Sequence, residues 1–257
     1  MRQTSFLCLC LCTLSASTAG AQWRVDPKPT LDIGGATGAD EYLFTHIEGL
    51  ARMSDGRILI ADQQMTDVRV FDATGKFLKH VGQKGRGPGE YSHPYWAGVA
   101  RGDTIYVYDY SEGPGTLLRY APSGAFIKSA IILSMDNAFA ALPVKLLRDG
   151  SLLLKGGVQA SYPPGRSRPY RGESGVIRFS FVDSVTNVMR IPGQIIDVAG
   201  SMKPWYVDGR VAATDSLLYV GDGETPTIKV YGLDGKLRRT ATVAIPRRPV
   251  TAQDKED

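Results

Sequence analysis

The chain has 257 residues, of which 43% are hydrophobic and 22% charged, a composition that excludes a wholly disordered chain. Its net charge of +4 is too small to indicate a nucleic-acid partner. The 29 glycines, 15 prolines and 12 tyrosines favour many short strands joined by tight turns.

The first 21 residues have the pattern of a secretory signal peptide. Arg2 gives a positive start, an apolar run follows over residues 6–14, and Ala19–Ala21 forms an A-x-A cleavage site. The apolar run is too short to span a bilayer, and no later segment is long enough. We therefore predict cleavage before Gln22 and an exported protein, periplasmic or extracellular, without a membrane span. All three cysteines lie in the signal segment, so the mature chain has no disulfide and no Cys-ligated metal.

The mature chain is organised by a repeat. Each unit has an apolar β-rich run, a polar loop, a second β-rich run and a glycine turn. The first runs of the four units are Ile58–Asp62, Ile105–Asp109, Leu152–Gly156 and Leu218–Asp222. The first three runs begin 47 residues apart, and the interval before the fourth is 66 because the third unit carries an insertion. This is the spacing of β-propeller blades, each with several strands.

The pattern predicts an all-β fold over residues 22–257, a β-propeller of four-stranded antiparallel blades. In the first unit the strands are expected at about 46–53, 57–61, 67–72 and 77–81. Helical periodicity is nearly absent, which argues against α/β and all-α folds. Tight hairpins between first and second, or third and fourth, strands are expected at Gly56, Gly75, Gly124, Gly150 and Gly235.

A glycine-rich segment, Gly82–Tyr91, separates the first two units and predicts a folded-back crossover, with Gly85, Gly87 and Gly89 in backbone angles that favour glycine. With the preceding run Val70–Phe77, it resembles the bacterial six-bladed β-propellers related to NHL repeats. The resemblance covers roughly residues 24 to 246. It implies the fold and export, but it supplies no catalytic residues.

The resemblance implies six blades, whereas only four are legible in the sequence. We therefore expect the chain to be part of a six-bladed ring that is incomplete at its C-terminus, with a strand over 23–33 that would close the ring. A four-bladed ring is the alternative, because four-bladed propellers exist.

The first apolar run of each unit is the second of the four expected strands. In three units this strand ends with an aspartate: Asp62, Asp109 and Asp222. Loops after second strands and between blades gather at one mouth of a propeller, where binding sites are usually found. A ring of carboxylates there suits a cation. We favour a structural role instead, in which each carboxylate accepts backbone N–H groups of its own loop.

Two groups of side chains are candidates for ligand binding at the mouth. They are Arg166, Arg168, Tyr170 and Arg171 in the insertion of the third unit, and Tyr95 and Trp96 at the start of the second. Arginine forks suit an anionic or sugar-like ligand, and aromatic rings form a platform. The alternatives are a solvated loop for the insertion and core wedges between blades for the aromatics. The expected partner is a protein, peptide or carbohydrate.

Enzyme motifs are mostly missing: the sequence has no Gly-x-Ser-x-Gly elbow, phosphate-binding glycine loop or His-Glu-x-x-His. His46 and Glu48 alternate on a first strand and are expected to face the channel together. Glu48 and Asp208 faintly resemble metal-binding positions of gluconolactonase-like propellers, although the expected middle Asn motif is missing. Two hypotheses therefore stand: a binding or scaffold protein without a cofactor, and a metal-dependent hydrolase that holds a divalent cation such as calcium.

Overall fold

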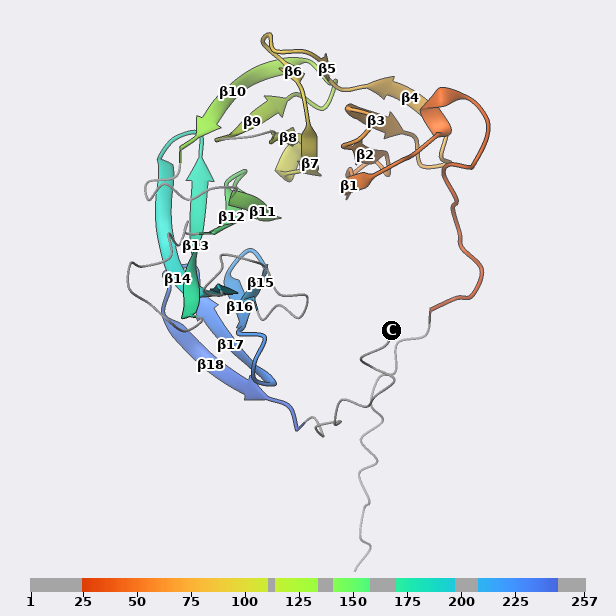
Figure 1. Ribbon diagram of the computed structural model, residues 1–257. Coiled ribbons are helices and arrows are strands. Elements are labelled where there is room, and N and C mark those ends of the chain that lie inside the picture. The colour runs from red at the N-terminus through yellow and green to blue at the C-terminus, as the bar shows by residue number, and fades with distance from the viewer. Residues whose placement is uncertain (1–24, 111–113, 134–140, 158–169, 197–207, 245–257) are drawn as a thin grey trace, which may run out of the picture. The chain divides into compact units, whose positions relative to one another are not determined.

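A computed structural model of the chain describes residues 25–110, 114–133, 141–157, 170–196 and 208–244 (Figure 1). The chain divides into two units, Met1–Asp32 and Ile33–Asp257. Within the described residues, regular structure is β-strand apart from two three-residue 3-10 turns, Asp40–Tyr42 and Arg101–Asp103. These observations confirm the predicted all-β class.

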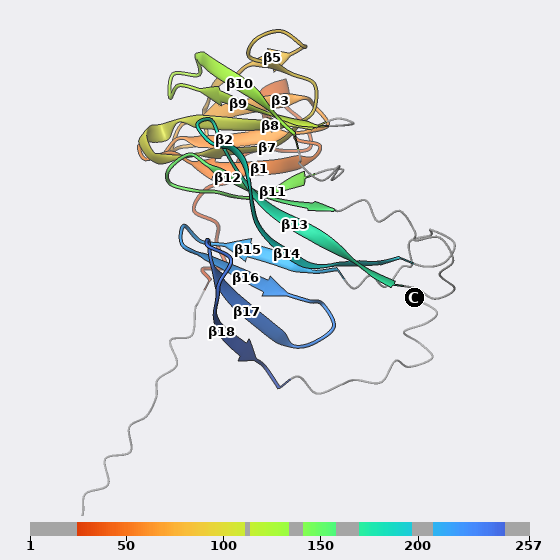
Figure 2. The same ribbon diagram turned by 90° about the vertical axis from the view of Figure 1, so that its left-hand side faces the viewer.

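The second unit contains four antiparallel sheets of four strands each, arranged as propeller blades (Figures 1 and 2). Blade 1 has β1 (Ile47–Arg52), β2 (Ile58–Asp62), β3 (Asp67–Phe71) and β4 (Phe77–His80). Blade 2 has β7 (Pro94–Val99), β8 (Ile105–Asp109), β9 (Gly115–Tyr120) and β10 (Phe126–Ile132). Blade 3 has β11 (Ala141–Leu146), β12 (Leu152–Gly157), β13 (Tyr170–Ser180) and β14 (Ser184–Ile196). Blade 4 has β15 (Arg210–Ala213), β16 (Leu217–Gly221), β17 (Thr227–Gly232) and β18 (Leu237–Thr242).

The hairpin turns form where the glycines predicted them. All five turn glycines have left-handed backbone angles, with φ of 90° at Gly56, 88° at Gly75, 86° at Gly124, 81° at Gly150 and 74° at Gly235. In the first blade the predicted strands match the observed ones to within one residue at each end. The glycine spacing therefore sets the length of each strand.

Alternate residues on the strands build an apolar seam between each pair of neighbouring blades. The seam between blades 1 and 2 includes Leu59, Ala61, Val68, Val70, Ile105, Val107, Leu118 and Tyr120. The seam between blades 2 and 3 includes Tyr106, Tyr108, Leu117, Leu152, Leu154, Ile177 and Phe179. The seam between blades 3 and 4 includes Leu153, Val176, Ile191, Leu218 and Val220. Each central sheet therefore buries both of its faces, as stacked blades require.

Three expectations differ from the structure. The described part of the predicted strand 23–33 is not a strand, and Pro27 and Pro29 there lack the N–H groups that a sheet ladder uses. The crossover contains a short parallel pairing of β5 (Gln83–Lys84) with β6 (Glu90–Tyr91). Of its three named glycines, only Gly89 has a left-handed angle, with φ of 78°.

The insertion of the third blade also differs from a simple loop. Strands β13 and β14 extend well past their neighbours (Figure 2). Their pairing begins where Ser180 lies opposite Ser184 and continues to where Tyr170 lies opposite Ile196. Tyr170 and Arg171, which were expected in the insertion, are therefore in strand β13. Residues 158–169 lie outside the described residues.

Candidate functional site

The inner strands of blades 1 and 2 carry matching irregularities. The register of β1 shifts between Ile47 and Gly49, and that of β7 shifts between Pro94 and Trp96, so Glu48 and Tyr95 each stand outside the ladder. These two residues are 47 positions apart, which is the repeat length. A β-bulge redirects a side chain, and such bulges are common beside binding sites. Glu48 and Tyr95 therefore occupy equivalent bulge positions on adjacent blades.

The two inner strands also approach closely at this level. A Cβ atom on Gly49 would lie only 2.5 Å from the backbone nitrogen of Ala97, so a larger residue would separate the strands. Glycine at this position permits the approach. The close packing of β1 on β7 brings Glu48 within electrostatic range of Tyr95. Burial first, and then the negative charge of Glu48, raises the pKa of the Tyr95 phenol above its ordinary value.

Glu48 is paired with an imidazole on the same strand. His46 Nε2 lies 3.0 Å from Glu48 Oε1, and the two side chains are 57% and 28% exposed. Solvent therefore reaches both a potential donor and an acceptor. His46 and Glu48 are therefore in contact, and their direction toward the channel stays a prediction.

Tyr95 belongs to an aromatic group. Its ring stands edge-on to Tyr110 with centroids 6.2 Å apart, and Tyr110 stacks on the buried Tyr108 at 6.3 Å. The Tyr108 hydroxyl donates to the Ala141 carbonyl at 2.6 Å, which fixes the stack from beneath. Tyr95 and Tyr110 are half-buried, so their rings offer part of their surface to a ligand. We call His46, Glu48, Tyr95 and Tyr110 the mouth cluster.

Trp96 has a different environment from Tyr95. It packs on the seam between blades 2 and 3, and its ring covers Gly98, where a Cβ atom would lie 2.3 Å from the indole. This placement matches the interpretation of Trp96 as a core wedge. Tyr95 also touches that seam, but its contacts with Tyr110 and Glu48 add a polar, accessible side.

The aspartates at the strand ends serve the backbone, as the structural interpretation predicted. Asp62 accepts the N–H groups of Thr45 and His46 at 2.7 and 3.1 Å, and that of Met65 at 3.1 Å. Asp109 similarly accepts the N–H groups that precede β7, at Ser92 and His93. The two carboxylates therefore fix the segments that lead into the bulged strands. The sequence analysis expected the partners within each aspartate's own loop. Most of them lie instead in the segment before the first strand of the blade.

Asp222 is the member of this group that serves its own loop. It accepts the N–H groups of Glu224 and Thr225 at 2.9 and 2.8 Å and also the Thr225 hydroxyl. The Thr225 N–H, as the largest cause, holds the pKa of this carboxyl below its ordinary value. Asp222 therefore remains ionised and hydrogen-bonded within the β16–β17 turn.

The basic candidates of the third unit divide between described and undescribed parts of the chain. Arg166 and Arg168 lie outside the described residues, and Tyr170 is placed only by its backbone at the start of β13. Arg171 lies on β13 and links blades 3 and 4. Its guanidinium donates to the Asp222 carbonyl and pairs with Glu224 Oε2 at 2.9 Å. Arg171 thus contacts the β16–β17 turn of blade 4. The structure therefore does not bring it together with Tyr95 in one site.

Glu48 and Asp208 were candidates to share a divalent cation. Within the described residues, no group of three or more His, Asp or Glu side chains is arranged to hold a metal ion. Asp208 Oδ2 lies 2.5 Å from the Lys155 ammonium, and both side chains are largely buried. Asp208 Oδ1 is buried without a hydrogen-bond partner among the described groups. A water or a small donor suits this oxygen better than a dication, because the dication would lie beside Lys155. These residues do not fit the implied metal.

A second polar cluster, which sequence reasoning missed, joins β3 to β4. Asp67 lies 2.6 Å from Arg69 Nε and 2.8 Å from His80 Nδ1. Arg69 is only 2% exposed and donates to the carbonyls of Glu41 and Leu43. The cluster therefore fixes the segment before β1 on the face of blade 1. The hairpin register, which the structure shows and the sequence does not, pairs Arg69 with His80.

Comparisons with known proteins support the fold. A family model described as a six-bladed β-propeller matches residues 37–143, which include blade 1, blade 2 and the start of blade 3. The four blades of the structure and this match confirm that the chain is a β-propeller, and the family that it matches over this part is described as six-bladed. No curated protein matches the chain. The relation to NHL repeats stays a prediction.

Several solved structures resemble the chain at low identity. A candidate exported protein from Bacteroides fragilis has a TM-score of 0.44 at 16% identity, over 82% of this chain and 74% of its own. A protein of unknown function from Bacteroides thetaiotaomicron has a TM-score of 0.46 at 13% identity, over 76% and 43%. A gluconolactonase from Xanthomonas campestris has a TM-score of 0.42 at 18% identity, over 74% and 60%. None of the helices in the described residues has the length and apolar character to cross a membrane.

Proposed function

We propose that this protein is an exported binding propeller that holds a carbohydrate at the mouth cluster. The observation that carries the proposal is the juxtaposition of Glu48 and Tyr95 by matching bulges on adjacent blades. Export rests on the predicted signal peptide, which lies outside the described residues. We propose recognition over hydrolysis because Asp208, which the hydrolase hypothesis requires, is paired with Lys155.

The chemistry of the cluster suits a neutral, polyhydroxylated ligand. A sugar ring has an apolar C–H face that packs on an aromatic ring, and hydroxyl groups that donate to a carboxylate. Tyr95 and Tyr110 supply the rings, and Glu48 supplies the acceptor. The buried stack beneath Tyr110 keeps the platform rigid, and rigidity lowers the entropic cost of binding.

A glycan array tests this proposal. We expect the wild-type protein to bind a subset of glycans and Tyr95→Ala to lose them, because the ring supplies most of the contact area. Glu48→Gln should weaken the same glycans about tenfold, since it replaces a charge-assisted hydrogen bond by a neutral one. Tyr219→Ala removes a half-exposed tyrosine from β16 of blade 4 and is the matched control. Binding of no glycan, or equal binding by wild type and Tyr95→Ala, would refute the proposal.

A further inference from the structure

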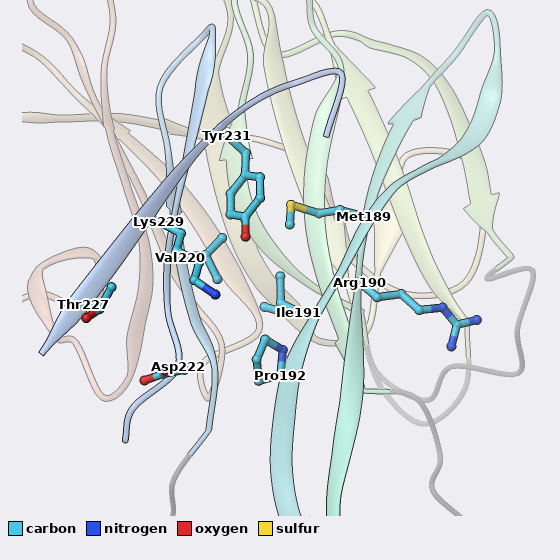
Figure 3. Close-up of a pocket in the computed structure, with 9 residues that line it drawn as sticks. All are labelled: Met189, Arg190, Ile191, Pro192, Val220, Asp222, Thr227, Lys229 and Tyr231. Carbon is cyan, nitrogen blue, oxygen red and sulfur yellow. The ribbon is translucent and has the colours of Figure 1, made fainter. Parts of the chain in front are cut away.

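A groove opens between blades 3 and 4, away from the mouth cluster. It has a volume of about 60 Å³ and lies between β14 on one side and β16 and β17 on the other (Figure 3). Met189, Ile191 and Val220 form its apolar surface, and Thr227, Lys229 and Tyr231 add polar groups. Figure 3 shows the Lys229 amino group and the Tyr231 hydroxyl directed into the groove.

The repeat shows why the groove exists. Val220 pairs with Lys229 in blade 4, and the equivalent pair in blade 2 is Val107 with Leu118. Leu118 is 2% exposed and fills the seam between blades 1 and 2, whereas the side chain of Lys229 is exposed. Blade 1 also has a basic residue at the equivalent position, Arg69, but Arg69 is 2% exposed and paired with Asp67, whereas Lys229 is exposed. An exposed, unpaired cation at a position that other blades bury is a candidate for function.

The charges around the groove leave Lys229 available. Among the described residues no carboxylate or carbonyl pairs with its ammonium group. Arg190 points away from the groove in Figure 3 and pairs with Glu173 on β13. Asp222 also lines the groove, but its oxygens are engaged by donors of the β16–β17 turn. Lys229 is therefore the cation that an incoming anion meets beside the apolar surface.

We propose that this groove binds a small amphipathic carboxylate, with the carboxylate at Lys229 and Tyr231 and the apolar chain along Met189, Ile191 and Val220. A carboxylate accepts hydrogen bonds from an ammonium and a phenol, and these charge-assisted bonds gain strength beside apolar walls. The alkyl chain displaces water from surface that, in the seam between blades 1 and 2, Leu118 covers. This site is independent of the mouth cluster, since it uses other blades and a different chemistry.

Decanoate and its neutral counterpart decanol are the probes, and binding is measured by isothermal titration calorimetry with the full chain. We expect decanoate to bind more tightly than decanol, and more weakly as salt increases. Lys229→Met keeps an apolar stem of similar length and should weaken decanoate about tenfold without changing decanol. Tyr231→Phe should weaken decanoate to a smaller extent.

Lys236→Met is the matched control, because Lys236 is an exposed lysine in the β17–β18 turn of the same blade. It should bind decanoate like the wild type. Thermal melting of all variants verifies that they fold. The proposal is overturned if decanoate does not bind, if decanol binds as tightly as decanoate, or if Lys229→Met and Lys236→Met bind decanoate equally well.

Discussion

The crossover between blades 1 and 2 permits a quantitative test at Gly89. Its φ of 78° lies in the left-handed region, which costs a residue with a Cβ atom about 1–2 kcal/mol. A Cβ atom there would also lie 2.9 Å from Phe126 Cβ. Phe126 cannot easily withdraw, because its ring packs edge-on against Tyr120, whose hydroxyl donates to the Gly89 carbonyl at 3.0 Å. Overpacking of this kind costs about 1–3 kcal/mol. We therefore expect Gly89→Ala to lower the free energy of unfolding by about 3 kcal/mol.

Gly102 provides the matched control for the backbone angle. Its φ is 74°, and no heavy atom lies within 4 Å of a Cβ atom built on it. Gly102→Ala should therefore cost only the conformational part, about 1 kcal/mol. Gly87→Ala should cost less than about 1 kcal/mol, because φ is not left-handed there and the nearest group is the movable Glu90 carboxylate. Equilibrium urea unfolding of the three variants measures the differences. Equal destabilisation by Gly89→Ala and Gly102→Ala would refute the packing argument.

Three other predictions concern single carboxylates. Asp62→Ala should reduce the free energy of unfolding by about 2–4 kcal/mol in urea, because it removes a buried carboxylate that accepts three backbone N–H groups; a loss below about 0.5 kcal/mol would contradict this. Hydrogen bonds from Gln83 and Gly87 lower the pKa of Glu90, so its contribution to stability is present above the ordinary pKa of 4.5 and lost as pH falls below it. Thermal melts of Glu90→Gln should therefore depend less on pH below that value, and an unchanged acid dependence would refute the assignment. Calcium should not raise the melting temperature, because Asp208 is already paired with Lys155; a calcium shift that Glu48→Ala abolishes would instead favour the metal-dependent hydrolase.

The sequence predicts the blades because their determinants are local. A strand in this repeat is an apolar run between two turns, and the left-handed glycines mark the turns directly. The roles of Asp62 and Asp109 were also predictable in kind, since an aspartate at a strand end commonly accepts backbone N–H groups. Their partners were not, because the donors lie 16–17 residues earlier in the chain.

The candidate sites depend on register, which the sequence does not display. Glu48 and Tyr95 were predicted for two different sites, and only the paired bulges show that they belong to one. Arg171 was placed in a loop because no local signal shows that β13 and β14 continue to pair beyond the length of their neighbours. The polar cluster of Asp67, Arg69 and His80 was missed for a similar reason, since a β-bulge sets which β4 residue faces Arg69.

Lys229 offers a test of whether the seam between blades 3 and 4 is specialised at the expense of stability. Filling the groove with an apolar side chain should recreate the packing that Leu118 provides between blades 1 and 2. Burying a leucine contributes about 1.5–3 kcal/mol relative to an exposed one, and a partly open groove realises only part of this. We therefore expect Lys229→Leu to raise the free energy of unfolding in urea by about 1 kcal/mol. The reciprocal change, Leu118→Lys, should destabilise by about 3 kcal/mol or more, because it buries an unpaired charge. If Lys229→Leu leaves stability unchanged or lowers it, the groove is not an unfilled version of the repeat seam. The argument that Lys229 is kept there at a cost in stability is then refuted.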